Sequence, residues 1–533
     1  MVSATNDNPY NRWILTIAPN TFRSVKRILK RDIGCQTLTA FFMKRKFFNA
    51  CCRHSILIKF DFFISLIFIN KISLDLGKPK TIPMRNLALM FAMLFPISLA
   101  FSQETADEKK AEKAKSGWNF GGLPVVAYDT DLGFEYGALV NLFHYGDGSI
   151  YPKYKHNIYA EVSRFTKGSG INRLFYDSKY VIPGIRLTAD LAYLTDKMYD
   201  FYGFNGYESV YNMDWADDES SFYRSRAFYK YDRKLTRFTS DLQGKFKNDK
   251  LGWVAGIGFY DFKVDTVDID KLNKGKDEAD KLPYVDGGLY KRYVDWGLID
   301  EDEKNGGFVT YLKFGAVYDT RDNEPNPMKG VWTEAVVTYA PSFLGIGSKY
   351  EHAKLSIIHR QYFTLVPERL SFVYRLGYQG TIFGKCPFYL QPNMTTLFLR
   401  GSVSEGLGGA KSLRGIIRNR VVGDGIAYGN LELRWKFARF QFINQNFYLS
   451  FNAFLDGGQV VQKVKLDVPS TITEAGYDVS DYFSPENDKL HTSWGVGLRI
   501  VMNQNFIIAV DHGRAMKSDD GTSGTYIGLN FLF

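Results

Sequence analysis

The stretch QNFYLSFNAFLDGG, residues 445–458, alternates between two kinds of side chain. One face of an extended strand would carry only apolar residues, which are Phe447, Leu449, Phe451, Ala453 and Leu455. The opposite face would be mostly polar, with Tyr448, Ser450, Asn452, Phe454 and Asp456. Successive side chains of a strand point to opposite faces. An apolar outward row beside a polar inward row is typical of a strand in a transmembrane β-barrel.

The same period of two recurs from Trp118 to the end of the chain, in segments of about ten residues separated by turn residues. The segments HTSWGVGLRIVM (491–502) and GTYIGLNFLF (524–533) show it clearly, and in the second the outward row would end with Phe531 and Phe533. Sixteen segments can be counted, and an even number is expected of a bacterial single-chain barrel. They are 121–128, 133–145, 154–166, 171–181, 185–195, 235–247, 250–262, 308–319, 331–340, 350–364, 370–383, 426–437, 446–457, 492–502, 505–513 and 524–533.

The connections between these segments sort by length. The long ones, 196–234, 263–307, 384–425 and 458–491, all follow odd-numbered segments, whereas tight turns follow even-numbered ones. Long external loops and short periplasmic turns are characteristic of outer-membrane barrels. The sequence therefore predicts an all-β fold, a transmembrane sixteen-stranded antiparallel β-barrel.

The N-terminal part of the chain has a different character. From Met84 the sequence MRNLALMFAMLFPISLAFSQE has a short basic region, an apolar run and small residues, as in a secretory signal peptide. We therefore expect a signal peptide at 84–102, cleaved after Ser102, and a non-native extension at 1–83. A charged periplasmic tether at 103–117 would then lead to the barrel at 118–533.

Charge and cysteine content support this division. Residues 1–83 hold 14 Lys and Arg and 4 Asp and Glu, which accounts for the whole formal charge of +10. The basic balance of the chain therefore does not indicate nucleic-acid binding. Cys386 is the one cysteine of the predicted mature protein, which excludes an intrachain disulfide and a thiolate metal cage.

Motifs of enzymes are missing from the sequence. It contains no G-x-S-x-G or H-E-x-x-H pattern, and its histidines lack the spacing of metal ligands. GLGGAKS at 406–412 is similar to a phosphate-binding loop, but Ala410 stands where that motif needs glycine. We therefore expect no enzyme activity, no metal and no cofactor.

Two carboxylates are predicted to face the barrel lumen after the basic stretch GGAKSLRGIIRNR, residues 408–420. The alternation places Glu432 and Asp456 on the inward faces of neighbouring strands. A buried charge needs a partner, and arginine fits a carboxylate bidentately. We therefore expect the 384–425 loop to fold into the lumen, with Arg414 bound to Asp456 and Glu432 nearby. A solvated surface loop is the alternative.

Three short motifs carry a resemblance to a known family. Leu413-Arg414-Gly415-Ile416 resembles the V-R-G-F/Y motif of the BamA/TamA bacterial surface-antigen superfamily, which lies on a loop that enters a sixteen-stranded barrel. Phe454, Asp456 and Gly458 are similar to the F-x-D-x-G motif of its thirteenth strand, whose aspartate pairs with the loop arginine. The C-terminal residues resemble the assembly signal of outer-membrane barrels, at Gly528, Phe531 and Phe533.

The resemblance implies a function in the insertion or export of outer-membrane proteins. Because only 103–117 would precede the first strand of the mature chain, we expect a member without POTRA domains that works with a periplasmic or outer-membrane partner. The outer membrane of a Gram-negative cell, its lipids and the machinery that assembles its barrels would be its environment. A passive pore for small solutes or ions, and a structural or adhesive surface barrel, are the alternatives.

Overall fold

The computed structural model describes residues 115–150, 153–247, 249–324, 326–344, 350–397, 405–442, 445–502, 506–529 and 532–533. The predicted N-terminal extension, the signal peptide and residues 103–114 of the tether lie outside the described residues.

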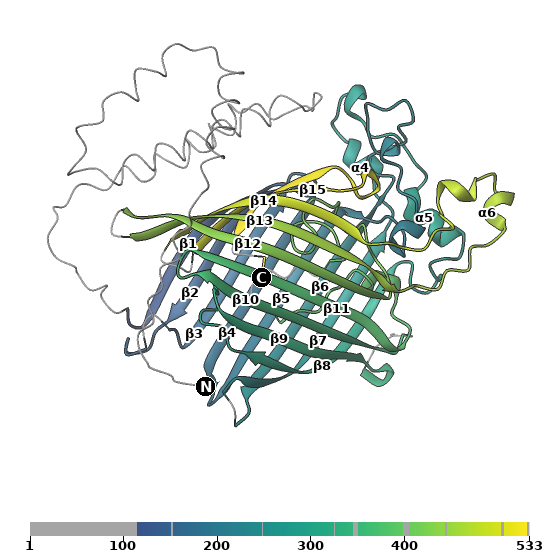
Figure 1. Ribbon diagram of the computed structural model, residues 1–533. Helices are drawn as coiled ribbons and strands as arrows, with labels where there is room; N and C mark the ends of the chain where they lie inside the picture. Colours follow the sequence, from purple (N-terminus) through teal and green to yellow (C-terminus); the bar gives the residue numbers. More distant parts are fainter. Residues whose placement is uncertain are drawn as a thin grey trace, which may run out of the picture. The chain divides into compact units, whose positions relative to one another are not determined.

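Sixteen antiparallel strands form one closed barrel, in which each strand pairs with its neighbours in the sequence and β1 closes onto β16 (Figure 1). The predicted sixteen-stranded barrel is therefore confirmed. The strands are β1 (Trp118–Asp129), β2 (Gly133–His144), β3 (His156–Phe165), β4 (Ser169–Ile182), β5 (Ile185–Asp200), β6 (Lys230–Lys245), β7 (Leu251–Asp265), β8 (Gly306–Asp319), β9 (Gly330–Ala340), β10 (His352–Val366), β11 (Leu370–Gly384), β12 (Gly425–Phe442), β13 (Gln445–Gln462), β14 (His491–Met502), β15 (Phe506–Ala515) and β16 (Ser523–Leu529).

The two faces of the wall differ as the alternation predicts. On β12, the apolar side chains of Leu431, Leu433 and Trp435 are exposed, whereas Glu432 and the polar side chains that alternate with this apolar row are buried. In a membrane the exposed row would contact lipid. Lipid cannot hydrogen-bond to the backbone N–H and C=O groups, and in the closed barrel these groups bond to neighbouring strands. The polar row faces the lumen.

The structure describes β16 as far as Leu529, whereas the predicted segment runs to Phe533. Phe533 does not continue the outward row. It is 3% exposed and packs against Tyr362 and Val373, two inward-facing residues of β10 and β11. Alternation predicts the face of a side chain only while the chain remains in a strand, which explains the difference.

Pairing between the first and last strands is short within the residues that the structure describes. Among the described residues, β1 pairs with β16 at Tyr128 with Ile527 and at Asp129 with Tyr526. The Thr130 amide extends this pairing by donating to the Thr525 carbonyl at 3.1 Å. By contrast, β12 pairs with β13 along almost its whole length. We refer to the β1–β16 pairing as the seam.

The long external connections carry the helices of the described chain, which are α4 (Ile269–Asn273), α5 (Gly288–Asp295) and α6 (Thr471–Glu474). Figure 1 shows all three at one end of the barrel. Short 3₁₀ turns lie at Gly206–Glu208, Met213–Trp215, Glu278–Asp280, Ser342–Leu344, Phe388–Leu390, Val479–Asp481 and Ser518–Asp520. Within the described part of the chain, no helix has both the length and the apolar character to cross a membrane.

These external connections pack into one aromatic cluster, which we name the cap. Its buried rings come from 201–231 and 289–296 together with Phe388, Tyr389 and Tyr482, and they pack on strand residues Tyr199, Tyr260, Phe262 and Tyr311. The sequence predicted these segments as loops and did not predict their shared core.

Candidate functional site

Arg414 is fully buried and bound on several sides. Its Nε and Nη2 donate to the two carboxylate oxygens of Asp456 at 2.9 and 3.0 Å, and its backbone amide donates to Asp456 Oδ2 at 3.1 Å. Its Nη1 donates to Glu432 Oε1 at 2.6 Å. The structure thus brings together the three residues that the sequence predicts to meet in the lumen. We refer to Arg414, Asp456 and Glu432 as the arginine site.

The strands fix where the carboxylates lie. Glu432 lies on β12 and Asp456 on β13, and both belong to the inward rows of these strands. Asn430 faces Asp456 across the β12–β13 ladder, one inward position from Glu432. Two adjacent strands therefore present two carboxylates to one guanidinium, a geometry that arginine satisfies with its planar set of donors.

Further charges complete the electrostatic balance around the arginine site. Glu432 also accepts from Arg434 Nε at 2.7 Å. Asp511 on β15 lies 3.6 Å from Arg414 Nη1 and accepts from Arg499 Nη2 at 2.8 Å. Three arginines thus face three carboxylates, so that the buried charges offset one another, as burial requires. Alternation along the sequence places Arg434 and Arg499 on inward rows, but it did not connect them with Arg414, and Asp511 was not predicted as part of the site.

Phe454 contributes an aromatic face to the arginine site. The Arg414 guanidinium carbon lies 3.5 Å from the centre of the Phe454 ring, within the range of a cation–π contact. Phe454 is two positions before Asp456 on β13, so both side chains point inward. The spacing of the strand motif therefore places the ring and the carboxylate on the same guanidinium.

Gly415 allows the loop to approach the wall closely. Its φ is +93°, and a Cβ on it would lie 2.4 Å from the carbonyl carbon of Gly513 on β15. Both the left-handed backbone and the close contact require glycine. The Gly415 amide donates to the Tyr526 hydroxyl at 3.2 Å. Because Tyr526 pairs with Asp129 in the seam, the loop also contacts the seam.

The neighbours of Arg414 form an apolar support. Leu413 and Ile416 are fully buried in a cluster with Leu407, Val421, Ile426, Tyr428, Val460 and Ala515. A Cβ on Gly458 would lie 2.8 Å from Leu407 Cδ1, so this strand glycine leaves room for the loop. The apolar residues on either side of Arg414 therefore exclude water from the ion pairs, which strengthens them.

Two more arginines of the basic stretch bind elsewhere. Arg418 Nε lies 3.0 Å from Glu405 and 3.6 Å from Asp200 at the end of β5. Arg420 donates to the carbonyls of Gly206 and Ser209 in the cap at 2.9 and 3.2 Å. Apart from Glu405, these partners lie about two hundred residues away in the sequence, so no local pattern could have identified them.

The predicted C-terminal signal is only partly described. Phe531 lies outside the described residues. Gly528 has open space where a Cβ would stand, and the Phe533 ring lies 5.2 and 5.1 Å from the guanidinium carbons of Arg375 and Arg434. The role of these residues in assembly stays a prediction.

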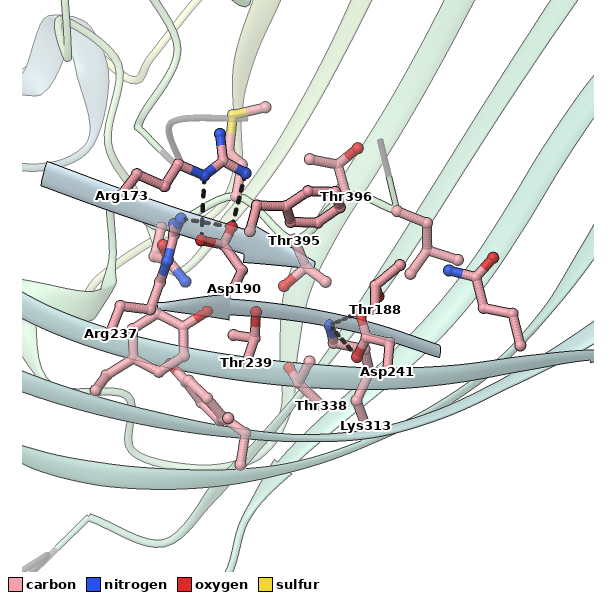
Figure 2. Close-up of a pocket in the computed structure, with 18 residues that line it drawn as sticks. Arg173, Thr188, Asp190, Arg237, Thr239, Asp241, Lys313, Thr338, Thr395 and Thr396 are labelled. Carbon is pink, nitrogen blue, oxygen red and sulfur yellow. Dashed lines mark hydrogen bonds and ion pairs between the residues drawn. The ribbon is translucent and has the colours of Figure 1, made fainter. Parts of the chain in front are cut away.

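A second feature of the lumen is a charged cavity between the wall from β4 to β9 and residues 393–397 (Figure 2). Arg173 donates to both carboxylate oxygens of Asp190, which also lies 3.3 Å from Arg237. Lys313 donates to Asp241 at 2.9 Å. Five threonines line the cavity beside these ion pairs, which are Thr188, Thr239, Thr338, Thr395 and Thr396. This part of the lumen is therefore polar, with three cationic side chains paired with two carboxylates.

No group of three or more metal-ligating side chains is arranged to hold an ion in the parts of the chain that the structure describes. Cys386 is a buried free thiol, and burial raises its pKa to about 11. A thiol with a raised pKa is a poor nucleophile at neutral pH.

A closed barrel with an apolar outer surface, a polar lumen and long connections at one end is an outer-membrane β-barrel. A family model described as the Omp85 superfamily domain matches residues 160–532. The chain belongs to the Omp85 superfamily, and the family resemblance that the sequence showed is confirmed. A search of curated protein sequences finds no match.

Solved structures similar to the chain include BamA from Haemophilus ducreyi lacking POTRA domains 1–3, with 15% identity and a TM-score of 0.46. That match covers 78% of this chain and 71% of the BamA chain. CdiB from Escherichia coli has 11% identity and a TM-score of 0.45, and CdiB from Acinetobacter baumannii has 12% and 0.40. Each match covers 78% of this chain, which spans 63% and 60% of the two CdiB chains.

Proposed function

We propose that this protein takes part in the insertion or export of outer-membrane proteins, and that it works by opening at the seam. A partner would supply the periplasmic part of the process. Membership of the Omp85 superfamily supports a function of this kind. The single observation that carries the proposal is the short pairing of β1 with β16.

The energetics of the wall favour opening at this position. Each ladder hydrogen bond contributes about 1 kcal/mol net, so a seam with few of them separates more easily than any long strand pair. On β1, residues from Trp118 to Ala127 pair with β2 on one side and have no described partner on the other. Separation of the seam would leave unpaired strand edges, which can pair with another chain.

The arginine site complements this opening. We propose that the 384–425 loop fills part of the lumen and that Arg414 fastens it while the seam separates. The bidentate contact with Asp456 and the bond to Glu432 support this role. A fastened loop would keep the lumen from becoming an open pore.

A disulfide across the seam tests the proposal. Tyr128 and Ile527 face each other in the ladder, so we would place cysteines at both positions in a Cys386→Ala background. Ile257 and Leu312, paired in the β7–β8 ladder, provide the matched control. We expect the seam disulfide to abolish the insertion or export phenotype of a deletion strain complemented with the variant, and the control disulfide to preserve it. Full complementation by a quantitatively crosslinked seam would contradict the proposal.

The partner and the mature N-terminus can be found in one experiment. Purification from membranes in mild detergent, followed by mass spectrometry, would identify proteins that remain bound to the barrel. The same spectra test the proposed cleavage after Ser102, because the mature chain would begin at Gln103. A mature N-terminus elsewhere would contradict this part of the proposal and leave the seam proposal standing.

The charged cavity of the lumen favours a second candidate function, a passive pore. Its ion pairs and threonine hydroxyls, shown in Figure 2, could line a path for ions or small polar solutes. Single-channel recording distinguishes the two functions. A steady conductance in the wild-type protein would favour the pore, and a small flickering conductance that grows in Arg414→Ala would favour the fastened loop.

A further inference from the structure

The cap contains a cavity that plays no part in the proposed opening of the seam. Three external segments meet there, and their aromatic rings pack into a common core. Its volume is about 550 Å³, within the range of small-molecule sites. A site built on a packed core is held in shape before its ligand arrives, which lowers the entropic cost of binding.

The first feature of the cavity is Arg224, which lies flat on an aromatic ring. Its guanidinium carbon is 3.4 Å from the centre of the Trp215 ring, and its Nη1 donates to the Tyr482 hydroxyl at 3.0 Å. These two contacts fix the plane of the guanidinium. An arginine has five N–H donors, so most of those on Arg224 remain for a ligand.

The second feature is Arg292 on α5, which lies near two further rings. Its guanidinium carbon is 5.0 Å from the centre of the Phe228 ring and 5.4 Å from that of Tyr477. Its Nη1 donates to the Gly288 carbonyl at 3.0 Å. Its Nε is buried and has no hydrogen-bond partner within the described residues. A buried donor without a partner is costly, and an acceptor from a ligand would relieve that cost.

The rim of the cavity has a different chemistry. Three carboxylates line it, Asp286, Asp478 and Asp481, and all three are exposed. Tyr284 is 77% exposed and presents its ring beside them. The cavity thus has two cations at its aromatic wall and hydrogen-bond acceptors at its rim.

We propose that this cavity binds an acidic sugar, a carboxylated pyranose of a surface glycan. The sugar carboxylate would accept from Arg224 and Arg292, whose planar donors match a carboxylate. The sugar hydroxyls would donate to the carboxylates of the rim, and its apolar ring face would pack on Tyr284 or Tyr477.

The arrangement of the charges, with arginines at the aromatic wall and carboxylates at the rim, favours this class of ligand over others. Three rim carboxylates would repel a polyanion such as a nucleic acid, whereas a neutral sugar would leave the buried Arg292 donor without an anionic partner. A single carboxylate surrounded by hydroxyl donors satisfies both parts of the cavity. Its place among the external connections puts it where glycans of the cell surface would reach it.

Binding to the purified full chain in detergent tests the proposal, with a trisaccharide of galacturonic acid and the matched neutral trisaccharide of galactose as probes. We expect the acidic probe to bind at least about tenfold more tightly, as one charge-assisted hydrogen bond would require. Arg292→Gln and Tyr284→Ala should each weaken binding of the acidic probe by about tenfold or more. Arg226→Gln is the control for the loss of a positive charge, because Arg226 is exposed, lies two residues from Arg224 and does not line the cavity.

Several results would overturn the proposal. These are no binding of the acidic probe at millimolar concentration, equal binding of both probes, or equal weakening by Arg292→Gln and Arg226→Gln. Tighter binding of a short peptide with a free C-terminal carboxylate would also overturn it, because the ligand would then be a protein terminus. Since Tyr284 lies on the rim and outside the aromatic core, the Tyr284→Ala variant separates loss of binding from loss of folding.

Discussion

The β12–β13 pair and the seam are built in opposite ways. The β12–β13 ladder runs from Gly425 with Gln462 to Phe442 with Gln445, and the arginine site binds to its inner face. The described part of the seam has two paired residues on each strand and the bonds between Thr130 and Thr525. One part of the wall is therefore held by a long ladder and by buried ion pairs, and the other by a few hydrogen bonds.

The comparison shows how one loop can connect a strong and a weak part of a barrel. Arg414 binds the strong part through Asp456, and the next residue, Gly415, binds Tyr526 in the seam. A change at the arginine site should therefore affect the seam, whereas a change in the seam should leave the arginine site intact. Substitutions in the two regions test this asymmetry.

Arg414→Ala should destabilise the protein by about 3 kcal/mol or more, because it leaves buried carboxylates without their partner. Urea unfolding in phospholipid vesicles measures the free energy. Arg439→Ala is the matched control, because the Arg439–Glu368 pair is exposed and its loss should change stability little. Equal stability of the two variants would show that the arginine site does not fasten the loop.

Gly415→Ala should cost about 2 kcal/mol, since the residue has a positive φ and a Cβ would collide with the backbone of Gly513. Protease digestion of the 405–424 segment should become faster. Gly121→Ala is the control, because the nearest atom to its Cβ would lie 3.9 Å away. Digestion of the two variants at the same rate would contradict the close contact between Gly415 and β15.

A sequence pattern predicts contacts only over the stretch of chain in which the pattern repeats. Alternation is local, so it placed Glu432 and Asp456 inward correctly, and the motif resemblance pointed to Arg414. The partners of Arg418 and Arg420 depend on the path of the loop through space, which no local pattern encodes. Phe533 lies beyond the described part of β16, so alternation placed it on the wrong face. The core of the cap forms between distant segments, and the abundance of Tyr and Phe was its one sign in the sequence.

Thr130→Val should weaken the seam by about 1 kcal/mol, because the Thr130 hydroxyl donates to the Thr525 carbonyl and accepts from the Thr525 amide. Hydrogen exchange of β16 should accelerate, while β12 and β13 should remain unchanged. Thr236→Val, on the exposed face of β6, should have no effect on either region. Acceleration across the whole barrel would contradict a local role for this bond.

Acid should loosen the cap at Asp488, which binds His491 and the amides of Tyr207 and Val460. Burial raises the pKa of Asp488. The hydrogen bond and charge of His491 and the bonds from the two amides lower it by more than burial raises it, so the pKa lies below its ordinary value of 3.8. The contribution of Asp488 to stability is therefore complete above pH 3.8 and lost as the pH falls through the lowered pKa. Limited pepsin digestion of 463–490 should accelerate in this range, and Asp488→Asn should remove the acceleration. The same pH profile in both proteins would contradict this account.

Hydrogen-exchange mass spectrometry of the wild-type protein in lipid nanodiscs tests the central comparison most directly. We expect peptides from β16 and from 118–127 to exchange at least about tenfold faster than peptides from β12 and β13, since about 1.4 kcal/mol of lost pairing corresponds to a factor of ten. We also expect Arg414→Ala to accelerate exchange in 405–424 and in β16. Equal protection of the seam and of the β12–β13 pair would contradict the comparison.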